Sequence, residues 1–387
     1  MSTVLSAHLA RSIFPAAICI AFCTQLHPAT AAARLGAPVL DPAFSRIIFL
    51  GDSITDGNTY PSLVRQAIIE AGYKPEPVAI NAGVGGNTAA EMLARVDSDV
   101  LAYHPTLVTI LAGANDTFHG VSPDSYAATI KAILDKIKPS GARVILLTPC
   151  ILGPARAGGR ALLSAYTEQL RQIAKENGLA VGEVTKVMQE EADAGQKLLS
   201  PDDLHPNYEG QRCIARAILD AMGLADVPVP AKCEPKLFPG LVKAWKFRPA
   251  AGLTLDDAGV VALKPDKTWI TVTLPDKTPV DADWLDDNRR EGFQTSMDKV
   301  VGPGSLVGIT TLNASHPRTV YLNTGGGISK MWLNGKLVFT AAAPWPGWHA
   351  GKERIPVELV RGVNTVVITE QGPFFLSVTD DNQWGMS

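Results

Sequence analysis

The chain has 387 residues, a length that predicts two domains rather than one. Hydrophobic residues make up 46% of it, which is enough to form a sizeable core, and its formal net charge is −3. So small a charge argues against nucleic acid or an anionic membrane surface as a partner, and no stretch is long and apolar enough to suggest a membrane span.

The first 31 residues have the pattern of a secretory signal peptide. Arg11 supplies a positive flank, residues 13–23 form an apolar run too short to cross a membrane, and Ala29-Thr30-Ala31 is a small-x-small cleavage site. A lipoprotein anchor at Cys23 is disfavoured, because Phe22 is larger than the small residue usual before such a cysteine. The leader therefore predicts a secreted or periplasmic protein.

Short apolar runs alternate with helical patterns between residues 46 and 223. The predicted strands are 47–50, 78–80, 107–111, 144–147 and 179–184, and the predicted helices are 60–71, 89–103, 123–137, 161–175 and 206–222. Strand–helix alternation of this kind predicts an α/β domain with a parallel sheet covered by helices on both faces.

The pattern of apolar residues changes from helical to β-type after a proline-rich, linker-like stretch at residues 224–239. Short β-type runs follow at 260–263, 269–274, 319–322, 330–333, 336–339, 355–360, 365–369 and 374–378, and Asn334-Gly335 is a hairpin signal. Residues 240–387 are therefore predicted to form an antiparallel β-sandwich. Cys150 and Cys213 resemble small buried hydrophobic residues, and a disulfide between Cys213 and Cys233 stays open.

Four polar segments supply the groups that acyl transfer requires. Ser53 directly follows the first apolar strand, and ligands bind at that edge of open α/β sheets. A serine there can act as a nucleophile if a base lies near it, and His205, with Asp202 three residues before it, supplies a base and an orienting acid. The backbone amides of Ser53 and Gly86 and the side-chain amide of Asn115 are candidates for an oxyanion hole.

These segments resemble the sequence blocks of the SGNH/GDSL hydrolase superfamily. The matching stretches are Gly-Asp-Ser-Ile at 51–54, the glycine block at 81–88, Gly-Ala-Asn-Asp at 113–116 and Asp-Asp-Leu-His-Pro-Asn at 202–207. The resemblance covers roughly residues 44–223 and implies a flavodoxin-like three-layer α/β/α fold with a Ser53–His205–Asp202 triad. Asp203 stands where glycine is usual, so a second acid lies beside the one that the spacing selects.

Histidine and cysteine spacing favours neither a metal nor a cofactor. The Gly-rich run at 83–86 lacks the lysine of a phosphate-binding P-loop, and no second histidine or cysteine completes a ligand pattern with His104 or His119. His104 is interpreted as structural. His119 lies four residues beyond Asn115, and whether it lines the pocket is left open.

All seven tryptophans lie beyond the linker. Trp269 and Trp332 fall inside strand runs and are expected to fill the sandwich core. Trp345 and Trp348 lie in a Pro-Trp-Pro-Gly-Trp-His stretch typical of a loop, where exposed rings can stack on sugars. Residues 338–360 also resemble the last strands of jelly-roll domains that accompany polysaccharide-active enzymes.

The sequence thus predicts a secreted serine esterase that removes O-acyl groups from carbohydrate, with O-acetyl as the favoured acyl group. A broad carboxylesterase or lysophospholipase is the alternative within the same chemistry. A non-catalytic glycan-binding protein is the alternative of another class, and the intact blocks argue against it.

Overall fold

The computed structural model describes residues 38–233, 239–273, 297–324, 327–341, 353–372 and 374–381. The predicted leader at 1–31 and the proposed sugar-stacking residues Trp345 and Trp348 lie outside the described residues. Within the described ranges, no helix has both the length and the apolar character needed to cross a membrane.

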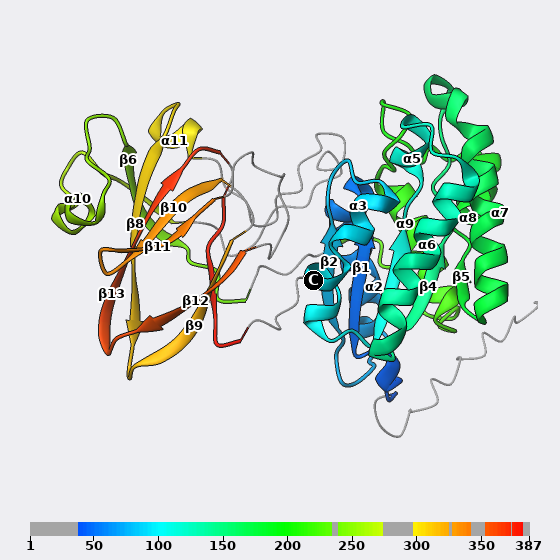
Figure 1. Ribbon diagram of the computed structural model, residues 1–387, viewed down its shortest axis with the longest axis horizontal. Coiled ribbons are helices and arrows are strands. Elements are labelled where there is room, and N and C mark those ends of the chain that lie inside the picture. Colours follow the sequence, from blue (N-terminus) through cyan, green and yellow to red (C-terminus); the bar gives the residue numbers. More distant parts are fainter. Residues whose placement is uncertain are drawn as a thin grey trace, which may run out of the picture. The chain divides into compact units, whose positions relative to one another are not determined.

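A five-stranded parallel sheet forms the centre of the first part of the chain (Figure 1). Its strands are β1 (Arg46–Gly51), β2 (Val78–Gly83), β3 (Leu107–Leu111), β4 (Arg143–Leu147) and β5 (Ala180–Gly182), in the order β2-β1-β3-β4-β5. Every neighbouring pair is parallel. This strand order is that of flavodoxin-like sheets, and the predicted fold class is confirmed.

Helices cover both faces of this sheet. On one face, Ile47 and Phe49 share a buried cluster with residues of α2 (Thr59–Glu70), α8 (Val184–Asp193) and α9 (Tyr208–Ala221). On the other face, Ile48 and Leu50 share a second cluster with residues of α3 (Ala89–Ala94), α6 (Pro123–Ile137) and α7 (Arg160–Asn177). Successive residues of a strand point to opposite faces, so a continuous apolar strand fills two cores at once.

The shorter helices lie mainly at strand ends. They are η1 (Pro42–Phe44), α1 (Ser53–Asp56), α4 (Val96–Asp99), η2 (Leu101–Tyr103), α5 (Ala114–Phe118), η3 (Lys138–Ser140) and η4 (Pro154–Gly159). The prediction of one helix over 89–103 is wrong. The first helix, α3, ends before Arg95, whose backbone angles of φ −115° and ψ 10° are not helical. The helix α8 was missing from the sequence prediction.

The second part of the chain is an antiparallel β-sandwich, as predicted. Its strands are β6 (Ala244–Pro249), β7 (Ile270–Thr273), β8 (Leu306–Ala314), β9 (Arg318–Thr324), β10 (Ile328–Leu333), β11 (Lys336–Thr340), β12 (Glu353–Leu359), β13 (Gly362–Glu370) and β14 (Ser377–Thr379). One sheet has the order β11-β10-β13-β8-β6-β7 and the other β12-β9-β14. Apolar side chains of both sheets, among them Leu322 and Ile368, form one buried cluster.

The predicted turn at Asn334-Gly335 joins β10 to β11, and both residues have positive φ, at 51° and 82°. The predicted strand at 260–263 is wrong. Those residues fall largely in α10 (Asp257–Ala262), which Asp256 caps by accepting the Gly259 N–H. Val260 of that helix packs with buried Trp269 and Trp332. A short helix, α11 (Asp298–Val301), precedes β8.

Residues that follow α9 belong to the α/β core. Val227 and Cys233 are buried in the cluster that holds α2 and α9, and the Tyr208 hydroxyl donates a hydrogen bond to the Ala231 carbonyl. Cys213 and Cys233 are both buried and are not joined by a disulfide. Residues 224–233, which the sequence analysis assigns to the linker, therefore include several that pack on the α/β core.

This packing predicts where the chain can be shortened. A chain ending at Cys233 should unfold cooperatively and keep activity on p-nitrophenyl acetate, because it retains both buried clusters of the α/β part. A matched chain ending at Gly223 should melt at a lower temperature, because it loses the Val227 and Cys233 side chains from one cluster. Calorimetry on both chains checks this, and equal melting temperatures would contradict it.

Candidate active site

Ser53, His205 and Asp202 form a hydrogen-bonded chain. The Ser53 Oγ lies 2.8 Å from His205 Nε2, and His205 Nδ1 lies 2.5 Å from Asp202 Oδ2. Because Nδ1 donates to the carboxylate, Nε2 is left to accept the serine proton. Two segments 152 residues apart in the sequence thus meet at the carboxyl edge of the sheet.

The loop before α9 determines which acid contacts the histidine. Asp202 Oδ1 accepts the backbone N–H groups of Leu204 and His205, each at 3.0 Å. Burial alone would raise the pKa of Asp202, but the hydrogen bonds from His205 and from these two amides keep this pKa below its ordinary value. Asp203 makes a different contact, because its Oδ2 accepts the Ala155 N–H at 2.8 Å.

Of the candidate oxyanion groups, Gly86 lies on the loop after β2 and Asn115 lies on α5. Gly86 has φ +83° and is exposed, and among the described residues beyond its two chain neighbours no atom lies within 4 Å of where a Cβ would sit. The Asn115 Nδ2 donates to Asp52 Oδ2 at 3.3 Å and to the Asn87 carbonyl at 3.1 Å. The Asn115 side chain therefore links the end of β1 to the glycine loop, and an oxyanion would have to share or replace one of its two present acceptors.

Asp52 is a buried acid next to the serine. Only 1% of its surface is exposed, and its Oδ1 accepts the Ile54 N–H at 2.9 Å. Burial is the main reason that its pKa rises from 3.8 to about 6, and the charge of Asp116 adds to the rise, while the Ile54 amide and His205 oppose it. An acid at this position therefore titrates well above the usual range of aspartate.

Sequence reasoning missed Arg95, which fastens the glycine loop to the ends of two strands. Its guanidinium donates to the carbonyls of Gly51 at 2.8 Å and Ala82 at 2.6 Å, and to Asn87 Oδ1 at 2.7 Å. It also forms an ion pair with Asp99 at 3.1 Å. Asn87 lies directly after Gly86, so these bonds hold the loop that carries a candidate oxyanion donor.

Asp116 was also missed, although it belongs to a recognised block. It is buried, and both of its carboxylate oxygens lie 3.2 Å from the Ala89 N–H at the start of α3. Burial raises its pKa. No sequence signal marks such a contact, because Asp116 and Ala89 are 27 residues apart.

His119 is exposed, and its Nδ1 donates to the Asn115 carbonyl at 2.9 Å.

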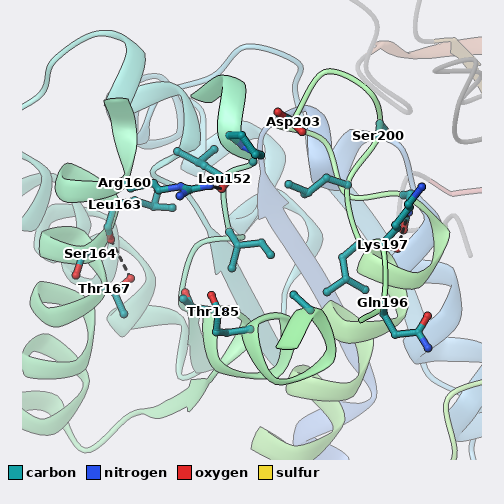
Figure 2. Close-up of a pocket in the computed structure, with 18 of the residues that line it drawn as sticks. Leu152, Arg160, Leu163, Ser164, Thr167, Thr185, Gln196, Lys197, Ser200 and Asp203 are labelled. Carbon is teal, nitrogen blue, oxygen red and sulfur yellow. Dashed lines mark hydrogen bonds between the residues drawn. The ribbon is translucent and has the colours of Figure 1, made fainter. Parts of the chain in front are cut away.

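A separate hollow of about 930 Å³ lies beside the histidine loop (Figure 2). Ser200 and Asp203 line it from that loop, and Leu152, Leu163 and Thr185 line it from the segment after β4, from α7 and from α8. Ser53 and His205 are not among its lining residues. This hollow is therefore distinct from the surface on which the serine and histidine meet.

A family model described as GDSL-like lipase/acylhydrolase matches residues 49–213. An acetylxylan esterase from Geobacillus stearothermophilus is 30% identical over 212 residues, which cover 46% of this chain and 94% of that protein. The chain belongs to the GDSL-like family. It is a carboxylic ester hydrolase of the SGNH type.

Two further relatives have other activities in their names. An arylesterase from Vibrio mimicus is 29% identical, with 46% of this chain and 87% of the relative covered. A thioesterase 1/protease 1/lysophospholipase L1 from Escherichia coli is 26% identical, with 45% of this chain and 81% of the relative covered. In each case the similarity covers less than half of this chain.

No group of three or more histidine, cysteine, aspartate or glutamate side chains in the described ranges is arranged to hold a metal ion.

The raised pKa of Asp52 predicts a pH effect on stability. As pH falls through about 6, the folded protein takes up a proton at Asp52, whereas the unfolded chain does so only near 3.8. Asp52 therefore contributes stability that is fully present below pH 3.8 and is lost as pH rises through about 6. The free energy of unfolding of the parent, relative to Asp52→Asn, should increase by about 2 kcal/mol between pH 7 and pH 4. Urea titrations at several pH values check this, and a constant difference would contradict it.

The bonds of Arg95 predict an effect on turnover. Arg95→Lys should lower kcat roughly tenfold to hundredfold with a smaller change in KM, because the glycine loop would lose its fixed position. Arg216→Lys is the matched control, since Arg216 also donates to two carbonyls, those of Val227 and Leu224, away from the serine. Equal losses of kcat in both variants would contradict a role for Arg95 in positioning this loop.

Proposed function

We propose that this ester hydrolase removes O-acetyl groups from carbohydrate through an acyl-enzyme formed on Ser53. The observation that carries the proposal is the unbroken hydrogen-bonded chain from Ser53 Oγ through His205 to Asp202. Such a chain suits a serine hydroxyl for attack on an ester carbonyl without a metal or cofactor.

In the proposed reaction, the Ser53 Oγ attacks the ester carbonyl carbon and His205 Nε2 takes the hydroxyl proton. The tetrahedral oxyanion would receive hydrogen bonds from the amides of Ser53 and Gly86 and from the Asn115 side chain. The bond to the alcohol breaks as His205 returns the proton to its oxygen. Water, activated by His205, then hydrolyses the acyl-serine and releases the acid. Asp202 holds the imidazole in place and stabilises its cation in both halves.

Three features support carbohydrate as the alcohol part of the ester. The relative with 30% identity is named an acetylxylan esterase. The chain carries a β-sandwich in addition to the hydrolase fold, and residues 338–360 resemble strands of domains that accompany polysaccharide-active enzymes. The leader pattern at 1–31 would deliver the enzyme to the periplasm or outside the cell, where such polymers occur.

A broad carboxylesterase or lysophospholipase is the second candidate. The names of the arylesterase and lysophospholipase L1 relatives favour it, at 29% and 26% identity. Release of acetate from acetylated xylan, compared with release of fatty acid from a lysophospholipid, distinguishes the two. Faster action on the lysophospholipid would overturn the carbohydrate proposal and leave the serine mechanism intact.

Alanine variants test the proposed triad. Ser53→Ala and His205→Ala should each lower kcat on p-nitrophenyl acetate by about 10⁴-fold or more, because nucleophile and base act as a unit. Asp202→Ala should cost less than either. Asp203→Ala is the matched control and should lower kcat less than tenfold, since Asp203 bonds to Ala155 rather than to His205. A larger loss in Asp203→Ala than in Asp202→Ala would reverse the assignment of the acid.

A further inference from the structure

One face of α5 points outward beside the candidate oxyanion group. Phe118 and His119 follow Asn115 by three and four residues, which places all three on the same side of a helical turn. Phe118 is 44% exposed, although it is a large apolar side chain, and His119 is also exposed. Thr117, the residue directly before Phe118, is buried and lies close to Gly159 at the end of η4. The short helix therefore presents an aromatic ring to solvent next to the proposed reaction centre.

Arg156 of η4 connects this ring to the histidine loop. Its guanidinium carbon lies 5.2 Å from the centre of the Phe118 ring, and its Nε donates to the Asp202 carbonyl at 3.3 Å. Asp202 in turn holds His205. Phe118 and Arg156 thus bridge the two sides of the candidate site, from the Asn115 side to the Asp202 side.

We propose that Phe118 and Arg156 form the subsite for the alcohol part of the ester, with a sugar ring stacked on Phe118 and its hydroxyls bound by Arg156. This inference rests on the proposed function, because it specifies where the carbohydrate binds. An aromatic ring accepts the C–H face of a sugar, and the guanidinium has five N–H donors, of which the bond to Asp202 uses the one on Nε.

The direction of proton transfer assigns this surface to the alcohol rather than to the acyl group. The leaving oxygen must lie near His205 Nε2 to receive its proton, so the alcohol part extends over the histidine side of the site. Arg156 contacts the loop on that side. An acetyl group is small and needs little surface, whereas an open, exposed platform suits a large alcohol.

The test compares two acetates that differ only in the alcohol. Acetate release is measured from acetylated xylo-oligosaccharide and from ethyl acetate, and the ratio of the two kcat/KM values is the readout. In Phe118→Leu this ratio should fall about tenfold, mainly through a higher KM for the oligosaccharide. Phe118→Tyr should restore the ratio, because it returns the aromatic face.

Arg156→Ala should also lower the ratio, by about threefold to tenfold. Arg143→Ala is its matched control. The Arg143 guanidinium carbon likewise lies over an aromatic ring, 5.6 Å from the centre of Phe44. Arg143 begins β4 and so lies at the end of the sheet opposite the candidate site. That control should keep the parent ratio. If the parent cleaves the oligosaccharide but Phe118→Leu keeps the parent ratio, because activity on both acetates falls equally or not at all, the subsite alone is overturned. A parent that cleaves ethyl acetate but no acetylated oligosaccharide would overturn the carbohydrate function itself.

Discussion

The site depends on a partly buried polar network that fastens the ends of β1 and β2 to the loops that follow them. Arg95 donates to the carbonyls of Gly51 and Ala82 and to the side chain of Asn87, and Asn115 donates to Asp52 and to the Asn87 carbonyl. Asp52 is buried and the other three side chains are half-buried, so a missing partner would leave a charge or an amide poorly satisfied. Such a network has few alternative arrangements and therefore fixes where the serine and the glycine loop lie.

Close backbone packing beneath the serine imposes a second constraint. A Cβ on Gly51 would lie 1.9 Å from Thr55 Oγ1, and a Cβ on Gly83 would lie 2.2 Å from the backbone nitrogen of Asp56. Only glycine lets α1 fold back against the ends of two strands. Ser53 begins that helix, so the same packing sets its direction toward His205. Glycines outside the catalytic groups thus determine the position of the nucleophile.

The sequence predicted local patterns well and long-range polar contacts poorly. The five parallel strands were found because each is a short apolar run, and the Asn334-Gly335 turn because both residues favour positive φ. The strand predicted at 260–263 is wrong because four apolar or small residues fit either structure, and Asp256 caps a helix there. Ser53, His205 and Asp202 were recognisable from their blocks. Arg95 and Asp116 were not, because their partners depend on how strands and helices meet in space.

Asp203 shows how one departure from the usual pattern reshapes the surroundings of the histidine. It occupies the left-handed region, with φ 59°, where a non-glycine residue is strained by about 1 kcal/mol. Its carboxylate accepts the Ala155 N–H, and its carbonyl accepts the Gly153 N–H. Gly153 is required there, because a Cβ would lie 2.3 Å from the Asp203 carboxyl. These bonds offset the strain and hold the start of η4 against the histidine loop. Glycine at this position could form the backbone bond but not the side-chain bond, so Asp203 adds a second bond between the histidine loop and η4, the helix that carries Arg156.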